Sequence, residues 1–247
     1  MMRNITCGLT SVTFRRHGWR EVIAIAQDCG LEGVEWGGDV HAPPGDVARA
    51  GEIRRATEAA GLAVLSYGSY YRLGAGECFA PVLACAQALG AGVIRVWAGT
   101  KGSSQYTTEE RALAVNDAEH IANLAKECGI AVALEYHRNT LTDTGESAVA
   151  LLKAAEGLRT YWQPNPELCH EANLAELTAV LPWLEHLHVF HWMPDGTRLS
   201  LQAGAAQWRD YIQCAAGHAR AAILEFVPGD DPAQCADDAE TLRGVLH

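Results

Sequence analysis

The sequence lacks any run of apolar residues long enough to span a lipid bilayer, so we expect no transmembrane helix. It also lacks a basic-then-apolar stretch at its N-terminus, and we therefore expect no secretory signal. None of the eight cysteines forms a Cys-x-x-Cys pair, which favours a reducing, cytoplasmic location. Five lie within apolar patterns and are expected to be small buried side chains: Cys7, Cys29, Cys85, Cys128 and Cys214.

Basic residues are scarce. The chain has 19 lysines and arginines against 30 aspartates and glutamates, which gives a formal net charge of −11. A nucleic-acid backbone is bound by basic surface, so this balance argues against nucleic acid as the partner. We expect the partner to be a small molecule, with no membrane involved, and leave a homo-oligomer open.

One local pattern recurs four times along the chain. A helical segment ends at a glycine, and a short strand rich in Val and Ile follows it; the glycines are Gly30, Gly61, Gly90 and Gly129. Glycine can adopt the left-handed conformation that ends a helix, and β-branched residues favour a strand. A spacing of about 30–40 residues is the length of one βα unit, so the repeats indicate a parallel sheet.

Eight strands are predicted in all: Ile5–Leu9, Gly33–Trp36, Ala63–Tyr67, Val93–Trp97, Val132–Tyr136, Thr160–Gln163, His186–Phe190 and Ala222–Val227. The helical patterns between them are Trp19–Cys29, Asp46–Ala60, Pro81–Leu89, Glu109–Cys128, Gly145–Ala155, Glu171–Leu177, Ala206–Ala215 and Asp237–Leu246. Eight βα pairs in 247 residues predict an α/β protein with a single (β/α)8 TIM barrel, one domain over residues 1–247. A doubly wound sheet is the alternative, but no Gly-rich phosphate loop follows the first strand.

Polar residues cluster late in these predicted strands, where the active site of a TIM barrel lies. They are Glu35, Arg95, Trp97, Glu135, His137, Gln163, Asn165, His186, His188 and Glu225. Side chains alternate between the two faces of a strand, so Ala131, Ala133 and Glu135 are expected to point into the barrel. For the glutamates, the structural alternative is a buried ion pair with Arg95. His186 is expected to be a deeper, hydrogen-bonded core residue.

A glutamate on the fifth strand, an amide on the sixth, a histidine on the seventh and a glutamate on the eighth resemble the xylose isomerase-like TIM barrels. The resemblance covers nearly the whole chain and is closest to the sugar isomerase and epimerase branch. Its most specific segments are Leu134–His137, His186–Val189, Trp208–Tyr211 and Leu224–Val227.

The resemblance implies that Glu135, His188 and Glu225 are metal ligands. Gln163 stands where the family usually has a ligating aspartate, and Pro166 where it has a second histidine. An amide oxygen still ligates a hard cation but contributes no charge, so affinity is expected to be lower. Two carboxylates, an imidazole and an amide suit Mn²⁺ or Mg²⁺, with Co²⁺ as a further candidate.

The expected activity is that of a metal-dependent isomerase or epimerase acting on a small sugar or polyol. Such a reaction removes a proton next to a carbonyl, and a divalent cation stabilises the resulting enediolate. Glu135 and Glu225 are the expected acid–base pair. Glu35, Arg95, His137 and Arg198 are the candidates for substrate binding, with walls formed by tryptophans 36, 97 and 192.

Three alternatives remain. An inosose-type dehydratase would use the same metal but eliminate water. A non-catalytic sugar-binding barrel is left open by Gln163. An endonuclease IV-like enzyme would need more metal ligands and a basic groove, which the acidic composition disfavours. Phosphate binding is weakly supported: Lys101 is the candidate, while Asp230 and Asp231 would repel phosphate from the last strand loop.

Overall fold

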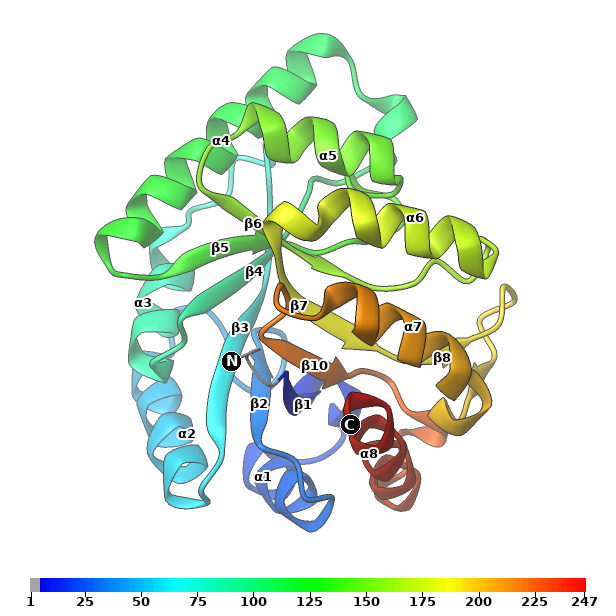
Figure 1. Ribbon diagram of the computed structural model, residues 1–247. Coiled ribbons are helices and arrows are strands. Elements are labelled where there is room, and N and C mark those ends of the chain that lie inside the picture. Colours follow the sequence, from blue (N-terminus) through cyan, green and yellow to red (C-terminus); the bar gives the residue numbers. More distant parts are fainter. Residues whose placement is uncertain (1–4) are drawn as a thin grey trace.

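The computed structural model describes residues 5–247, and within them eight parallel strands close into a barrel with helices around it (Figure 1). The order of strands around the barrel is β1-β10-β7-β6-β5-β4-β3-β2. Their bounds are β1 Thr6–Thr10, β2 Gly33–Gly37, β3 Ala63–Arg72, β4 Val93–Trp97, β5 Ala131–Leu134, β6 Leu158–Trp162, β7 Leu184–Val189 and β10 Ala221–Leu224. A short antiparallel hairpin, β8 His191–Trp192 with β9 Arg198–Leu199, follows β7.

A helix follows each barrel strand. These are α1 Trp19–Asp28, α2 Val47–Ala59, α3 Ala80–Leu89, α4 Thr108–Glu127, α5 Gly145–Ala154, α6 His170–Val180, α7 Ala205–Ala215 and α8 Pro232–Leu246. The predicted (β/α)8 barrel is thereby confirmed. The four glycines of the recurring pattern all have positive φ angles, between 65° and 76°, which lets each helix stop and the chain turn into the next strand.

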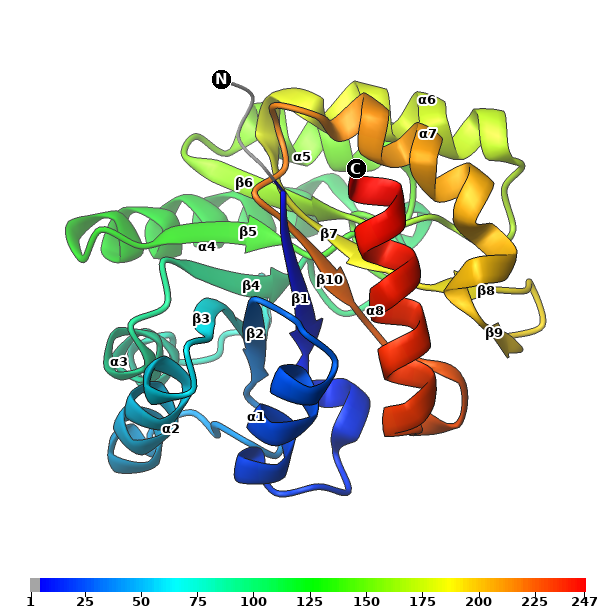
Figure 2. The same ribbon diagram turned by 60° about the horizontal axis from the view of Figure 1, so that its bottom comes forward.

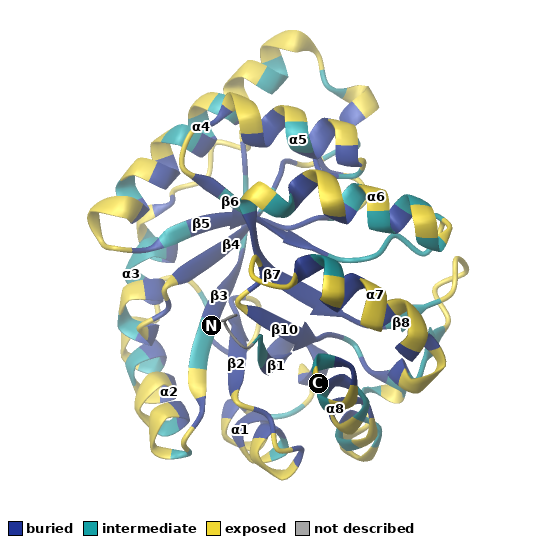
Figure 3. Ribbon diagram, in the orientation of Figure 1, coloured by how far each residue is buried: buried dark blue, intermediate teal, exposed yellow. Residues whose placement is uncertain are grey.

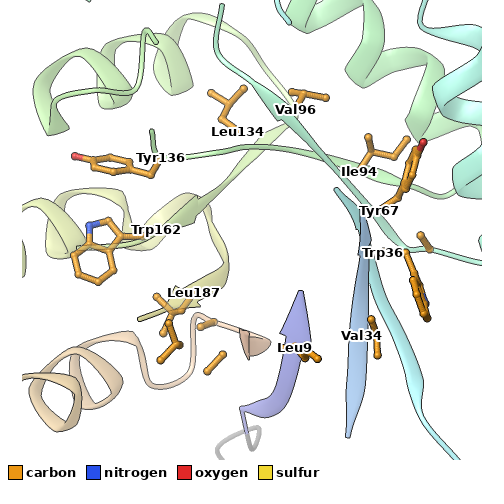
Figure 4. Close-up of a cluster of buried hydrophobic side chains, with 14 of the residues drawn as sticks. Leu9, Val34, Trp36, Tyr67, Ile94, Val96, Leu134, Tyr136, Trp162 and Leu187 are labelled. Atoms are coloured by element: carbon orange, nitrogen blue, oxygen red, sulfur yellow. The ribbon is translucent and has the colours of Figure 1, made fainter. Parts of the chain in front are cut away.

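Outward-facing side chains of the strands form one continuous apolar core with the helices. Figure 4 shows members of this core, including Leu9, Val34, Ile94, Leu134 and Leu187, on the helical side of their strands. Figure 3 shows the consequence along the chain: the barrel strands are mostly buried, and the helices are exposed on their outer faces. This burial supplies most of the driving force for folding.

The inside of the barrel is filled separately. Val93, Ala133, Tyr161, Ala221 and Ile223 form a second buried cluster. Because side chains alternate along each strand, the residues two positions further on point inward at the C-terminal end of the barrel. That end is where the polar residues predicted from the sequence come together.

Several predicted boundaries shift by a few residues. The fifth, sixth and last barrel strands end at Leu134, Trp162 and Leu224, so Glu135, Gln163 and Glu225 lie just beyond them rather than within them. The last helix begins earlier than predicted, at Pro232, because Asp231 caps it by accepting a hydrogen bond from Ala233 N.

Two of the cysteine predictions are wrong. Cys128 is exposed and Cys214 is only half-buried, because both lie near helix ends, where the outer side is open to water. Cys7, Cys29 and Cys85 are buried as predicted.

The two ends of the described chain lie together. β1 pairs with β10 to close the barrel, and α8 packs against β1 (Figure 2). Among residues 5–247, no helix combines the length and the hydropathy that a bilayer crossing requires.

Candidate metal centre and active site

Six polar side chains converge inside the C-terminal end of the barrel, one from each of six strands or strand ends. They are Glu35, Arg95, Glu135, Gln163, His188 and Glu225. Alternation along the strands points each of them inward, opposite the apolar residues that face the helices.

Arg95 lies between two of the glutamates and is almost fully buried. Its Nε donates to Glu35 Oε1 at 3.2 Å, and its Nη1 donates to Glu135 Oε2. Burial alone would lower the pKa of Arg95, but the carboxylates of Glu135, Glu35 and Glu225 outweigh it and raise the pKa. The guanidinium therefore stays charged.

Glu35 is held by four donors. Thr10 Oγ1 and Ser66 Oγ donate to it at 3.2 and 2.8 Å, and His188 Nε2 lies 3.2 Å from Oε1, in addition to Arg95. Burial would raise the pKa of Glu35, but the charges of Arg95 and His188 hold it well below its usual range. Glu35 is thus an ionised carboxylate whose oxygens are fully engaged by protein groups.

His188 connects Glu35 to the other side of the site. Its Nδ1 lies 3.2 Å from Gln163 Oε1 and 3.5 Å from Glu225 Oε2. Burial would lower the pKa of His188, but Glu225 and Glu35 raise it. Burial, with the charges of Glu135 and Glu35, raises the pKa of Glu225 against the opposing effect of His188 and Arg95. Three carboxyl groups, those of Glu35, Glu135 and Glu225, thus share the centre with one guanidinium and one imidazole.

These residues fit a divalent cation. One ligand atom from each of Glu135, His188 and Glu225 lies within 4.8 Å of the others, and all three residues are buried. This is close to the span that a cation with ligand bonds of about 2.1 Å bridges. The amide oxygen of Gln163 lies 3.2 Å from Nδ1 of His188, where it could serve as a fourth metal ligand. An excess of buried carboxylate around such a space is the charge pattern that a cation would balance.

Aromatic side chains form the rim above these groups. Trp97 stacks on His137 with ring centroids 4.5 Å apart, and the guanidinium of Arg72 lies over the Trp97 ring, 4.2 Å from its centroid. Trp192 packs beside Phe226, the residue after Glu225. Trp97 and Trp192 thus lie beside residues that follow β5 and β10.

Arg198 lies on β9 at this rim. Its Nη1 donates to Asp230 at 2.6 Å, and its guanidinium lies 4.9 Å from the Phe226 ring centroid. A second arginine, Arg15, reaches the same ring from the segment after β1. Sequence reasoning missed Arg15, because it lies outside any strand and no local pattern distinguishes it from the neighbouring Arg16.

Two details differ from the prediction. His186 is buried as expected, but neither ring nitrogen has a hydrogen-bond partner among the described residues, and its ring packs edge-on against Tyr161 with centroids 5.1 Å apart. Trp36 faces the helical core rather than the site. His41, which follows β2, is buried, and its two ring nitrogens lie 3.0 Å from Ser11 Oγ and from the carbonyl oxygen of His17.

The loop proposed for phosphate gains no support. Lys101 donates to Glu110 at 2.7 Å, so its charge is already paired.

A sequence model of the family described as xylose isomerase-like TIM barrel matches residues 23–213. A 3-dehydroshikimate dehydratase of Bacillus anthracis is 33% identical over 100 residues, which cover 38% of this chain and only about a third, 35%, of that relative.

Solved structures of similar shape span nearly the whole chain. The probable 3-DHS dehydratase of Bacillus anthracis superposes with a TM-score of 0.82 at 19% identity, covering 97% of this chain and 99% of that one. D-psicose 3-epimerase of Clostridium cellulolyticum H10 superposes with a TM-score of 0.74 at 13% identity, covering 98% of this chain and 100% of that one. A xylose isomerase-like barrel of Mycobacterium smegmatis in complex with magnesium superposes with a TM-score of 0.71 at 16% identity, covering 100% of this chain and 98% of that one. At these identities the likeness concerns the fold.

Proposed function

The chain belongs to the xylose isomerase-like TIM barrel family, and from this premise we propose that it is a divalent-metal-dependent isomerase or epimerase of a small sugar or polyol. The observation that carries the proposal is the convergence of buried Glu135, His188 and Glu225 at the C-terminal end of the barrel. Gln163 completes the proposed ligand set, and Mn²⁺ or Mg²⁺ suits these donors.

A divalent cation bound there would act as a Lewis acid that polarises the substrate carbonyl and stabilises developing negative charge. The protein itself must remove a proton from the adjacent carbon and return one. Glu135 and Glu225 are the proposed acid–base pair, since they approach from strand ends separated by β6 and β7. General acid–base catalysis of this kind contributes roughly 10²–10⁴-fold.

The remaining groups position this pair. Arg95 fixes a carboxylate oxygen of Glu135, and we propose that its other donors face substrate hydroxyls. Glu35 holds Arg95 and His188 in place. His137, stacked on Trp97, is the proposed hydrogen-bonding group at the rim.

A dehydratase is the second candidate. It is favoured by the identity with the 3-dehydroshikimate dehydratase and by the TM-score of 0.82 to the probable 3-DHS dehydratase. Elimination of water also begins with proton removal next to a carbonyl, so the same residues would serve. The products separate the two candidates: an isomer keeps the mass of the substrate, whereas elimination lowers it by one water.

The first test is metal binding. Protein stripped of metal is titrated with Mn²⁺ and with Mg²⁺, and calorimetry measures the affinity. We expect Glu135→Gln and Glu225→Gln each to weaken binding by at least about ten-fold, since each removes a charged ligand. Gln163→Asp should strengthen metal binding, because it replaces a neutral ligand with a charged one. Glu185→Gln is the matched control, a buried glutamate that pairs with Arg159 and Arg220 away from the site.

Activity is then followed by NMR in D₂O with a panel of ketoses, keto-inositols and 3-dehydroshikimate. The proposal expects metal-dependent deuterium incorporation at carbon, lost by at least about 100-fold in Glu225→Gln. Unchanged metal affinity in both glutamate variants would contradict the proposed centre. Ligand binding that survives Glu225→Ala without any exchange would instead support a sugar-binding barrel.

A further inference from the structure

Two arginines from segments far apart in the chain meet at one aromatic ring beside the proposed active site. The guanidinium carbon of Arg15 lies 5.2 Å from the Phe226 ring centroid, and that of Arg198 lies 4.9 Å from it. Both distances end at the same centroid, so the two guanidinium carbons are no farther apart than the sum of 5.2 and 4.9 Å. Arg198 also lies 5.6 Å from the Trp192 centroid. Two like charges this close repel each other unless negative groups are near.

The ring that they share is held firmly next to Glu225. Phe226 has a φ of 50°, an unusual conformation for a residue with a side chain. Its backbone N–H donates to Thr13 Oγ1 at 2.9 Å, which ties it to the segment after β1. The ring that both arginines contact is therefore one residue from Glu225, a proposed acid–base group.

Each arginine has an acidic partner but keeps free donors. Arg198 uses Nη1 for Asp230, and in the described part of the chain its Nε and Nη2 have no partner. Arg15 uses Nε for Asp39 and Nη2 for the hydroxyl oxygen of Tyr70, which leaves Nη1. Guanidinium presents five N–H donors in a planar fork.

Both side chains are also within reach of solvent. The side chain of Arg15 is 39% exposed and that of Arg198 is 33% exposed. Tyr70 links Arg15 inward, since its ring packs against Trp97 at 6.2 Å between centroids. A ligand entering from solvent thus meets guanidinium groups at the aromatic rim before it reaches the glutamates.

We propose that Arg15 and Arg198 form a carboxylate-binding subsite at the mouth of the barrel, so that the substrate is a small polyhydroxylated carbonyl compound that also carries a carboxylate group. This rests on the proposed function, because it assigns the charge of that function's substrate. A monoanionic carboxylate is favoured over a phosphate because Asp39 and Asp230 already lie against the arginines, and they repel a dianion more strongly. The free Nε and Nη2 of Arg198 form an edge that can pair bidentately with a carboxylate, and Nη1 of Arg15 adds a further donor.

The experiment compares two ligands that differ at one carbon. D-gluconate carries a carboxylate where D-glucitol carries a hydroxymethyl group, and the other hydroxyls are the same. Their dissociation constants are measured by NMR titration with metal-free protein and again with Mg²⁺, so that ligation of a metal by the carboxylate is separated from its pairing with arginine. Near-UV circular dichroism checks that each variant is folded.

For the wild-type protein we expect gluconate to bind at least about ten-fold more tightly than glucitol, in the metal-free form as well. The double variant Arg15→Gln/Arg198→Gln should bring the ratio close to one. Arg20→Gln is the matched control, because Arg20 lies over the Trp19 ring at 3.9 Å, on helix α1 and outside the mouth; it should keep the wild-type ratio.

Asp230→Asn gives the sharpest discrimination. If Arg198 binds the carboxylate, removing its competing partner raises the preference for gluconate, opposite to the effect of Arg198→Gln. If the Arg198–Asp230 pair serves only to fasten the β8–β9 hairpin, the two variants change the ratio in the same direction, and the proposal is overturned. A wild-type ratio of one also overturns it, as does tighter binding of D-glucitol 6-phosphate than of gluconate.

The outcome is separable from that of the proposed function. The gluconate preference is measured without metal or turnover, whereas the proposed centre is tested by metal affinity and by carbon-bound proton exchange. An enzyme that exchanges protons in neutral ketoses but shows no carboxylate preference would retain the function and lose this inference.

Discussion

At the scale of single residues, Arg95 determines the charge balance of the centre. It is the buried cation between Glu35 and Glu135, and breaking such a buried pair typically costs about 3–5 kcal/mol because one charge is left uncompensated. The space for it depends on a glycine. A Cβ added to Gly68 on β3 would lie 2.6 Å from Arg95 Nη2 and 3.1 Å from Glu35 Oε1.

We therefore predict that Gly68→Ala destabilises the protein by about 1–3 kcal/mol, since the buried ion pair must shift to admit a methyl group. Gly92→Ala is the matched control: no atom lies within 4 Å of its added Cβ, and its φ is not positive. That change should be neutral or slightly stabilising. Urea denaturation of both variants provides the measurement, and equal free energies of unfolding would contradict the role assigned to Gly68.

At the scale of elements, the site depends on contacts between segments that follow the first and last barrel strands. The short 3₁₀ helix Ser11–Phe14 after β1 carries Thr13, which accepts the N–H of Phe226 beyond β10. The same helix carries Ser11, whose hydroxyl accepts the N–H of Gly37 at the end of β2. One element thereby fixes the ends of both neighbouring strands.

Thr13→Val keeps the shape of the side chain and removes the acceptor for Phe226. We predict a loss of about 1–2 kcal/mol in the free energy of unfolding, because an N–H in a strained segment is left unpaired. Metal affinity should fall as well, since Glu225 immediately precedes Phe226.

The matched control for this change is Thr57→Val. Thr57 is equally buried, but its hydroxyl donates within α2 to the carbonyl of Ile53. It should leave metal affinity unchanged. An unaltered affinity in Thr13→Val, measured by calorimetry, would show that the segment after β1 does not position Glu225.

At the scale of the whole molecule, barrel closure places buried ionisable groups far from water. His41 is fully buried between Ser11 and the carbonyl of His17, and this burial lowers its pKa from the usual 6.5. The folded protein therefore takes up a proton at His41 less readily than the unfolded chain does.

The sign of the pH effect follows. Below about pH 6.5 the unfolded chain binds a proton that the folded chain does not, so the free energy of unfolding should fall as the pH drops through this value. His41→Gln should flatten this slope, whereas His218→Gln, at an exposed position, should not. Denaturant unfolding between pH 5 and 8 measures the slopes, and equal slopes in wild type and His41→Gln would refute the assignment.

Much of this arrangement is encoded locally. Helix-ending glycines, β-branched strands and the alternation of apolar with polar residues predict the barrel and bring Glu135, His188 and Glu225 to one end of it. Such features could be predicted because they depend on neighbours within a few residues along the chain. The predicted strand boundaries differ from the observed ones by a few residues, because strand ends are fixed by hydrogen bonds to other strands.

What the tertiary structure alone decided is which groups pair. Strict alternation would turn Ser66 away from the site, but the register between β2 and β3 shifts after Val34, and Ser66 therefore lies opposite Glu35 and donates to it. Likewise, only barrel closure brings Arg15 and Arg198 to the same ring. The sequence by itself determined the fold and the inward-facing charges; their partners depended on strand register and closure, which are set by contacts between segments distant along the chain.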